Sequence, residues 1–195
     1  MLQMEYGFCA DYGDGDNAYD TVTLPLPPPP QSEPVRLAAL RRLRLLDISP
    51  PRLGGRGAAL PPELVIFARL VTVQPPEQAS TEAAVALADV DAYARREERR
   101  GSVRHFIRAL ASERLAEYPT SASEDNALLN ALQQEMDREP DSELSMSRSQ
   151  RRQRLRCALQ IRRAEKRILE RWVLALADDA HEVARDVQLK GELRI

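Results

Sequence analysis

The sequence contains few residues of the kinds that build metal, disulfide or nucleotide sites. Among its 195 residues are 2 histidines and 2 cysteines, and Cys9 and Cys157 lie far apart without a C-x-x-C spacing. This scarcity disfavours a zinc site and favours free thiols in a reducing compartment. The sequence also lacks a Gly-rich phosphate loop and a G-x-G-x-x-G motif, so it offers no site for a nucleotide.

Long hydrophobic runs are absent as well. No apolar stretch approaches the length of a membrane span, and the first residues lack the basic-then-apolar order of a signal peptide. The 28 basic and 30 acidic residues nearly cancel, which gives no general reason to bind nucleic acid or an acidic membrane. We therefore expect a soluble, intracellular protein without a membrane or nucleic-acid partner. The compartment (plastid, cytosol or nucleus) and the oligomeric state stay open.

Two candidate motifs, a calcium loop and a nucleophilic triad, lack the residues that their spacing requires. The acidic loop at residues 11–17 is similar to a calcium loop, but the fifth position counted from Asp14 is Ala18, and no glutamate closes the loop. His105 and His181 lie on expected helices without a G-x-S-x-G elbow or a suitable cysteine. The sequence therefore predicts neither a metal site nor a nucleophilic triad.

The N-terminal part of the chain has the pattern of β-strands. Apolar side chains alternate with polar or small ones over residues 2–8 and again over 21–26. The second stretch is a candidate partner for the first, and Pro25 would confine it to a sheet edge. Because two strands alone are marginally stable, an opening strand without an upstream neighbour predicts a domain that is cut short. The prolines at 27–30 then favour an extended linker, with a P-x-x-P docking site as the less favoured interpretation.

Beyond the prolines the apolar residues recur at helical spacing, which predicts a mainly α fold. The last of the expected helices is the longest element. The helices are expected over residues 37–46, 60–71, 80–92, 103–115 and 121–136, and from after Ser147 to beyond Leu176.

Residue chemistry marks several ends of these helices. The prolines of L-P-P at 60–62 suit a first turn, because the missing N–H of a proline would have no helical partner there. Pro119 stops the helix before it, and Ser121 and Glu124 have the spacing of a capping box. The charged run at 95–100 is interpreted as a solvated helix end.

Two charged residues share the apolar stripe of the last helix. Helical steps from Ala158 reach Arg162 and Glu165 before Leu169. We interpret Arg162 and Glu165 as a candidate ion pair within the bundle, and a charged pocket for a peptide is the less favoured alternative. Because buried charges persist when they are paired, Glu165→Ala is predicted to cost about 3–5 kcal/mol of stability. The basic stretch at 148–156 lacks interleaved aromatic residues, which disfavours nucleic-acid binding.

Four stretches of the sequence have the order and character of one family's motifs. They are E-Y-G-F at 5–8 with N-A-Y-D-T-V-T-L at 17–24, L-P-P-E-L at 60–64, Y-P-T-S-A-S-E-D at 118–125, and R-L-x-x-A-L-Q-I-R-x-x-E-K-R-I-L at 154–169. Together they resemble the SET-domain protein-lysine methyltransferases related to the Rubisco large-subunit methyltransferase (LSMT). The resemblance extends over most of the chain.

This resemblance implies a domain organisation. Residues 1–33 would be the C-terminal β remnant of a SET domain with a proline-rich linker, 34–187 a helical, bundle-like substrate-binding domain, and 188–195 a tail. In such enzymes the SET fold binds S-adenosylmethionine and transfers its methyl group, while the helical domain helps to hold the protein substrate. The sequence contains no SET core, cofactor loop or N-H motif, so we expect this chain alone to bind no cofactor and to be inactive.

Tyr6 matches an active-site position of the family. The resemblance implies that it lies at the lysine channel, where a phenol oxygen can orient the amine for attack. We therefore expect the substrate-binding portion of a protein-lysine methyltransferase, with an incomplete catalytic site. The alternative is a stand-alone, non-catalytic helical module that binds proteins. The cofactor-binding and substrate-binding residues, the protein substrate and its target residue stay open.

Overall fold

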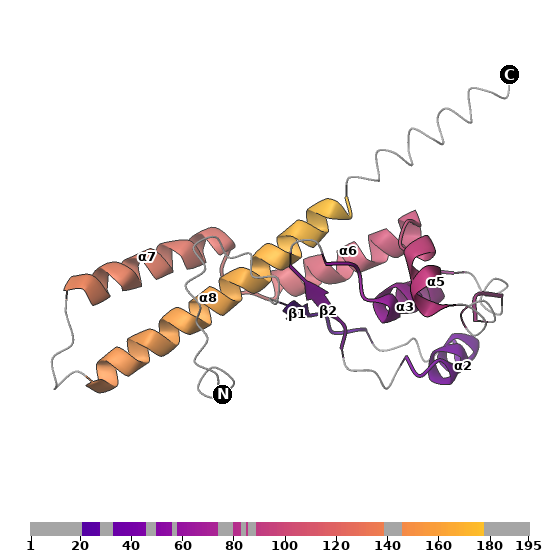
Figure 1. Cartoon of the computed structure of the whole chain (residues 1–195), viewed down its shortest axis with the longest axis horizontal. Coiled ribbons are helices and arrows are strands. Elements are labelled where there is room, and N and C mark those ends of the chain that lie inside the picture. Colours follow the sequence, from indigo (N-terminus) through magenta and orange to yellow (C-terminus); the bar gives the residue numbers. More distant parts are fainter. Residues whose placement is uncertain are drawn as a thin grey trace, which may run out of the picture.

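The structure is a computed structural model that describes residues 21–27, 33–45, 50–55, 58–73, 80–82, 85, 89–138 and 146–177. Helices make up most of this part of the chain, accompanied by a short two-stranded sheet (Figure 1). The predicted mainly α fold is therefore confirmed. The elements are β1 (Thr21–Thr23), α2 (Pro34–Arg42), β2 (Arg52–Gly54), α3 (Pro62–Thr72), α5 (Val90–Glu97), α6 (Gly101–Ala116), α7 (Ala122–Arg138) and α8 (Met146–Ala175).

The two strands form an antiparallel pair in which Val22 lies opposite Leu53. Both side chains are fully buried, as the alternation over 21–26 predicts for Val22. The described partner strand was not predicted. Alternation suggests residues 2–8 as the partner of 21–26, and residues 2–8 lie outside the described part of the chain. The prolines and glycines at 50–55 predict only the end of the preceding helix, whereas the structure has β2 there. Alternation identifies a strand but not its neighbour, because pairing depends on which buried faces meet.

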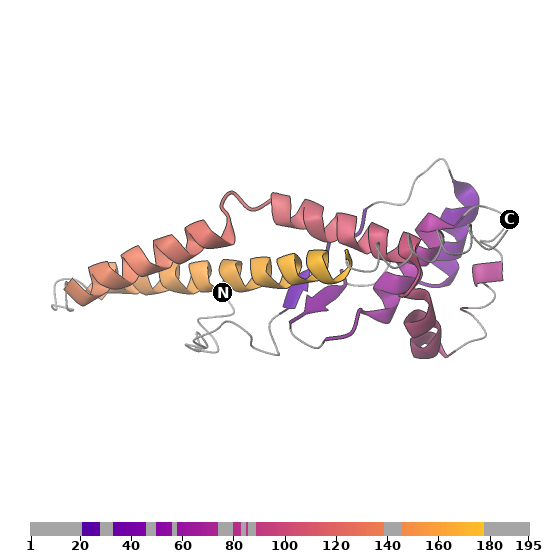
Figure 2. The same ribbon diagram turned by 90° about the horizontal axis from the view of Figure 1, so that it is seen from above.

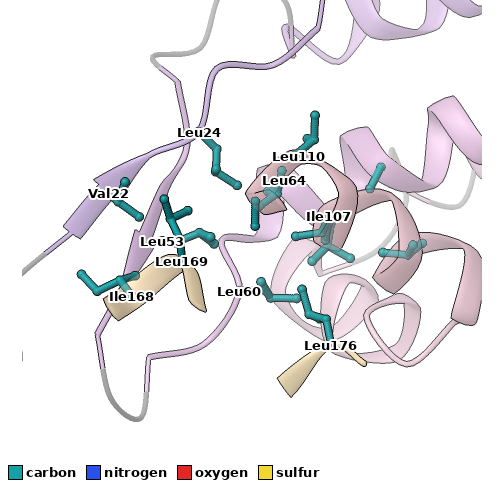
Figure 3. Close-up of a cluster of buried hydrophobic side chains, with 14 of the residues drawn as sticks. Val22, Leu24, Leu53, Leu60, Leu64, Ile107, Leu110, Ile168, Leu169 and Leu176 are labelled. Carbon is teal, nitrogen blue, oxygen red and sulfur yellow. The ribbon is translucent and has the colours of Figure 1, made fainter. Parts of the chain in front are cut away.

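The main hydrophobic core lies where the sheet meets α3, α6 and α8 (Figure 3). Helix α3 is buried at every residue of Leu64–Leu70, because it packs against α2, α5 and α6. Pro62 opens this helix, which confirms the predicted proline start. From α8, Leu169 belongs to the same cluster, and the indole Nε1 of Trp172 donates a hydrogen bond to the carbonyl oxygen of Gly54 at 3.0 Å.

Helix α7 and the N-terminal half of α8 form a hairpin that extends away from this core, and we call this hairpin the arm (Figures 1 and 2). The C-terminal half of α8 packs instead against α6 and the two strands. With 30 residues, α8 is the longest described element, as predicted, and its length is about 45 Å at the usual helical rise. Neither α8 nor any other described helix is long and apolar enough to cross a membrane.

The helix expected over 80–92 is not one element. Within that range α5 begins separately at Val90, because the Asp89 carboxylate caps it by accepting a hydrogen bond from the backbone N–H of Asp91 at 3.0 Å. The continuous helix was therefore a wrong prediction, and the Asp89 cap was the sequence signal that it overlooked.

Helix α7 buries less of its apolar stripe than predicted. Helical spacing predicts that Leu128, Leu129, Leu132 and Met136 form the buried stripe of this helix. Leu132 is buried, whereas Leu128 is 47% exposed. The reason is that α8 covers one side of α7, and the opposite side of the arm faces solvent (Figure 2). The stripe predicts a helix correctly but not how many neighbours that helix has.

Cys157 on α8 is disulfide-bonded in the structure, so the prediction of a free thiol is wrong for this residue. The other cysteine, Cys9, lies outside the described residues. Sequence spacing excludes a local C-x-x-C motif, but it does not show whether a cysteine without a neighbouring cysteine in the sequence is bonded.

Candidate functional site

Two of the motifs, at 118–125 and 154–169, meet where the arm joins the core. Side chains from the loop between α6 and α7, from the first turn of α7, and from α8 form one network of hydrogen bonds and ion pairs. We call this network the clasp. Its members are Tyr118, Thr120, Asp125, Arg162, Glu165 and Lys166.

Reciprocal capping holds the first turn of α7 in place. The Glu124 carboxylate accepts a hydrogen bond from the backbone N–H of Ser121 at 2.6 Å, and the Ser121 hydroxyl accepts one from the backbone N–H of Glu124 at 3.1 Å. The predicted capping box is therefore confirmed. The hydrogen bonds from the Ser121 N–H and hydroxyl also lower the pKa of Glu124. Because this turn is anchored, Asp125 has a fixed place on the buried side of α7.

Asp125 lies at the centre of the clasp, and its side chain is 0% exposed. Its two carboxylate oxygens accept hydrogen bonds from Lys166 Nζ at 2.5 Å, from the Thr120 hydroxyl at 2.7 Å and from the Arg162 Nε at 3.1 Å. A second Arg162 nitrogen also binds the carboxylate, so this contact is bidentate. Burial alone would raise the pKa of Asp125, but the hydrogen bonds from Arg162, Lys166 and Thr120 outweigh it and lower the pKa to about 2.

Lys166 is buried as completely as the carboxylate that it binds. Its Nζ also donates to the Thr120 hydroxyl at 2.9 Å and to the backbone carbonyl of Ser121 at 3.4 Å. The three acceptors match the three N–H donors of an ammonium group. The same nitrogen lies 5.3 Å from the centre of the Tyr118 ring, within the range of a cation–π contact. A buried lysine is tolerated here because every donor has a partner.

Tyr118 connects the clasp to α6 and to a second position on α8. Its hydroxyl donates a hydrogen bond to the Glu165 carboxylate at 2.7 Å, and the Arg114 guanidinium lies 5.4 Å from the centre of its ring. Burial and the hydrogen bond to Glu165 raise the pKa of Tyr118, because both favour the neutral phenol. The tyrosine thus remains a hydrogen-bond donor at physiological pH.

The ion pair predicted between two charged residues of α8 has a different arrangement in the structure. Arg162 and Glu165 each have a partner outside α8, Asp125 for the arginine and Tyr118 for the glutamate, rather than each other. Helical spacing places the two side chains on one face, but it cannot show that the neighbouring loop supplies nearer partners. Tyr6, the candidate catalytic residue, lies outside the described residues.

A second buried carboxylate lies at the end of α5, in the charged run that the sequence interpreted as a solvated helix end. Glu97 is 1% exposed and contacts Arg69 of α3 at 3.0 Å and Arg96 at 3.2 Å, and Arg100 also pairs with it. The interpretation of 95–100 was wrong at this position. The sequence A-R-L-V at 68–71 belongs to the motif that begins with L-P-P-E-L, but the pairing of its arginine with Glu97 was not predicted. Arg69 is a buried cation on α3, and such a residue requires a counter-charge. We call these four residues the Glu97 cluster.

The side chains of both clusters bind one another, which is the arrangement of structural contacts. All the oxygen atoms of Asp125 accept hydrogen bonds from neighbouring side chains, which leaves the carboxylate without room for a substrate. No group of three or more His, Cys, Asp or Glu side chains in the described part of the chain is placed to hold a metal ion. The clasp therefore fixes the direction in which the arm leaves the core.

The fold and clasp define a helical domain with a charged joint between a core and an arm. A family model described as Rubisco LSMT substrate-binding matches residues 32–169, which include α2 to α7, both clusters and most of α8. The chain belongs to this family. No match was found among curated proteins, and none among solved structures.

The family model includes three of the four motifs that carried the resemblance. The segments at 60–64, 118–125 and 154–169 all lie within the matched range, and the structure gives them separate structural roles. The first begins α3, while the other two provide the clasp. The segments at 5–8 and 17–24, which carried the resemblance to a SET domain, precede the matched range.

Proposed function

We propose that this chain is the substrate-binding portion of a SET-domain protein-lysine N-methyltransferase. The observation that supports this most strongly is the match to the Rubisco LSMT substrate-binding family over residues 32–169. Methyl transfer from S-adenosylmethionine to a protein side chain would be carried out by the SET core of such an enzyme. Tyr6 is the residue that we assign to the lysine channel on the basis of resemblance.

The clasp supports a binding role rather than a catalytic one. Its charged groups are paired with one another, so they make the joint between arm and core rigid and do not act as reactive groups. A rigid joint is useful in a substrate-binding domain, because a surface held in one geometry loses less conformational entropy when a partner docks. We therefore propose that the protein substrate binds to a surface of the helical domain that the clasp orients.

The first experiment asks whether the full 195-residue chain has a cofactor site of its own. Isothermal titration with S-adenosylmethionine is expected to give no binding heat. Clear binding at a 1:1 ratio would contradict the proposal that the cofactor site belongs to a separate SET core.

The second experiment asks whether the chain presents substrates to such a core. The full chain would be fused to the SET core of a family member from which the native substrate-binding domain has been removed. With labelled S-adenosylmethionine, the fusion is expected to transfer more methyl label to protein lysines than the core alone. Equal labelling would contradict the proposed function and favour the alternative of a stand-alone, non-catalytic module.

A further inference from the structure

The face of α8 that enters the core continues outward along the arm. In the C-terminal half of the helix, Leu169 belongs to the core cluster and Trp172 packs against it, and Leu176, directly after the helix, also belongs to the cluster. Helical steps of three and four residues extend this face from Leu169 back to Ala158 and Arg151. The same side of the helix is thus buried at one end and exposed at the other.

The exposed part of this face is basic toward the N-terminal end of α8 and apolar beyond it. Leu155 is 51% exposed and Ile161 is 44% exposed, so two large aliphatic residues of this part of α8 are left uncovered. Ala158 lies exposed between them. We call this surface the outer face of α8. It consists of Arg151, Arg154, Leu155, Ala158 and Ile161.

The arginines of the outer face differ from those that face α7. Arg152 binds the Glu135 carboxylate at 2.9 Å, so its charge is used within the arm. Arg151 and Arg154 are exposed, and neither has a hydrogen bond or an ion pair with another residue of the described chain. The outer face therefore presents two uncompensated cations beside an uncovered apolar strip.

We propose that the outer face of α8 docks an acidic, amphipathic helical segment of the protein substrate. This inference rests on the proposed function and adds the chemical class of the partner. Leucine-like anchors at helical spacing would contact Leu155, Ala158 and Ile161, while flanking Glu or Asp side chains would pair with Arg151 and Arg154.

The same observations disfavour two other occupants. A single-stranded nucleic acid would need aromatic side chains for base stacking, and the outer face has none. A membrane surface would need a longer apolar face than Leu155 and Ile161 provide. The clasp strengthens the case for a protein partner, because it holds α8 in position before binding.

The test uses the full chain and two labelled synthetic helical peptides. In the first peptide, leucines at i, i+3, i+4 and i+7 alternate with glutamates, and in the second every glutamate is replaced by lysine. Fluorescence anisotropy is expected to show at least tenfold tighter binding of the glutamate peptide, weakening as salt is raised. Binding of both peptides with equal affinity would overturn the proposal.

Substitutions on the chain then locate the binding surface. The double variant R151E/R154E is expected to lose at least tenfold in affinity for the glutamate peptide, and the variants L155S and I161S should each weaken it. The matched control is R95E/R99E, which makes the same charge change at two exposed arginines near the end of α5. An equal loss in the control would overturn the proposal, because it would indicate a general charge effect.

Two outcomes separate this inference from the proposed function. If polyuridine or anionic lipid vesicles bind more tightly than the glutamate peptide, and that binding needs Arg151 and Arg154, the proposed protein partner is overturned. If the fusion with a SET core still labels its substrates after R151E/R154E, the outer face is not the docking site, while the proposed function stands. If R151E/R154E removes the labelling but R95E/R99E does not, both are supported.

Discussion

The clasp and the Glu97 cluster are both buried carboxylates surrounded by cations, but their cations differ in access to water. Asp125 is paired with Lys166, which is itself 0% exposed. Glu97 is paired with one buried arginine, whereas the side chains of Arg96 and Arg100 are 70% and 52% exposed. Two buried carboxylates therefore need not contribute equally to the stability of the fold. The loss of one partner is most damaging where the other partner cannot be rehydrated.

The largest expected effect is that of Asp125→Ala. It removes the counter-charge of the buried Lys166 together with four hydrogen bonds, so we expect a loss of about 3–5 kcal/mol in the free energy of unfolding. Chemical denaturation measures this loss, with Asp137→Ala, an exposed carboxylate of the same helix, as the control. A loss no larger than that of the control would show that Asp125 stabilises the fold no more than an exposed carboxylate does.

Glu97→Ala strands the buried Arg69 but is expected to have a smaller effect, of about 2 kcal/mol. The reason is that the other two of its three cations, Arg96 and Arg100, are exposed and can be hydrated when their partner is lost. The same denaturation experiment applies, with the exposed Glu113→Ala as the matched control. If Glu97→Ala destabilises the protein as much as Asp125→Ala, then the exposure of the cations does not explain the difference between the clusters.

The pH dependence of stability gives a second measure of how much Asp125 contributes. The pKa of Asp125 is lowered from 3.8 to about 2, so the folded state binds a proton less readily than the unfolded chain. This group therefore contributes about 2 kcal/mol above pH 4, and the contribution is lost as the pH falls from 4 through 2. Denaturation midpoints over this range should show the loss in the wild type. The Asp125→Asn variant should lack this component, and an unchanged profile would contradict the assignment.

The smallest effects are expected at the edge of the clasp. Tyr118→Phe removes one partly buried hydrogen bond to Glu165, and we expect a loss of about 1 kcal/mol. Glu165→Ala is expected to cost about the same, because Arg162 keeps Asp125 as its partner. This revises the value of about 3–5 kcal/mol that followed from an Arg162–Glu165 ion pair. In a double-mutant cycle the two substitutions should be less than additive, and full additivity would show that the bond contributes nothing.

The parts of the site that the sequence could predict are the local ones. The Ser121–Glu124 capping box and the proline start of α3 follow from residues a few positions apart, and both were confirmed. Helix α8 was also predicted as the longest element, because its periodicity continues over many turns. Local hydrogen bonds and periodicity depend little on the rest of the fold, which is why they can be read from the chain alone.

The parts that the sequence missed are contacts between distant segments. Arg162 and Glu165 share a helical face, and nothing in their spacing shows that Asp125 and Tyr118 are closer partners. Glu97 stands among exposed charged residues, and only the packing of α5 on α3 buries it against Arg69. Burial is a property of the assembled fold, so a charge pattern cannot distinguish a solvated residue from a buried one.

The sequence by itself determined the helical character of this protein, the ends of several helices and the motifs that match the Rubisco LSMT substrate-binding family. These follow from hydrophobic period, capping and proline chemistry, which act within a few residues. Only the tertiary structure decided that the motifs at 118–125 and 154–169 form one clasp and that one side of α8 is buried in the core yet exposed along the arm. The reason is that α8 is long enough to leave the core, so the same face meets two different environments.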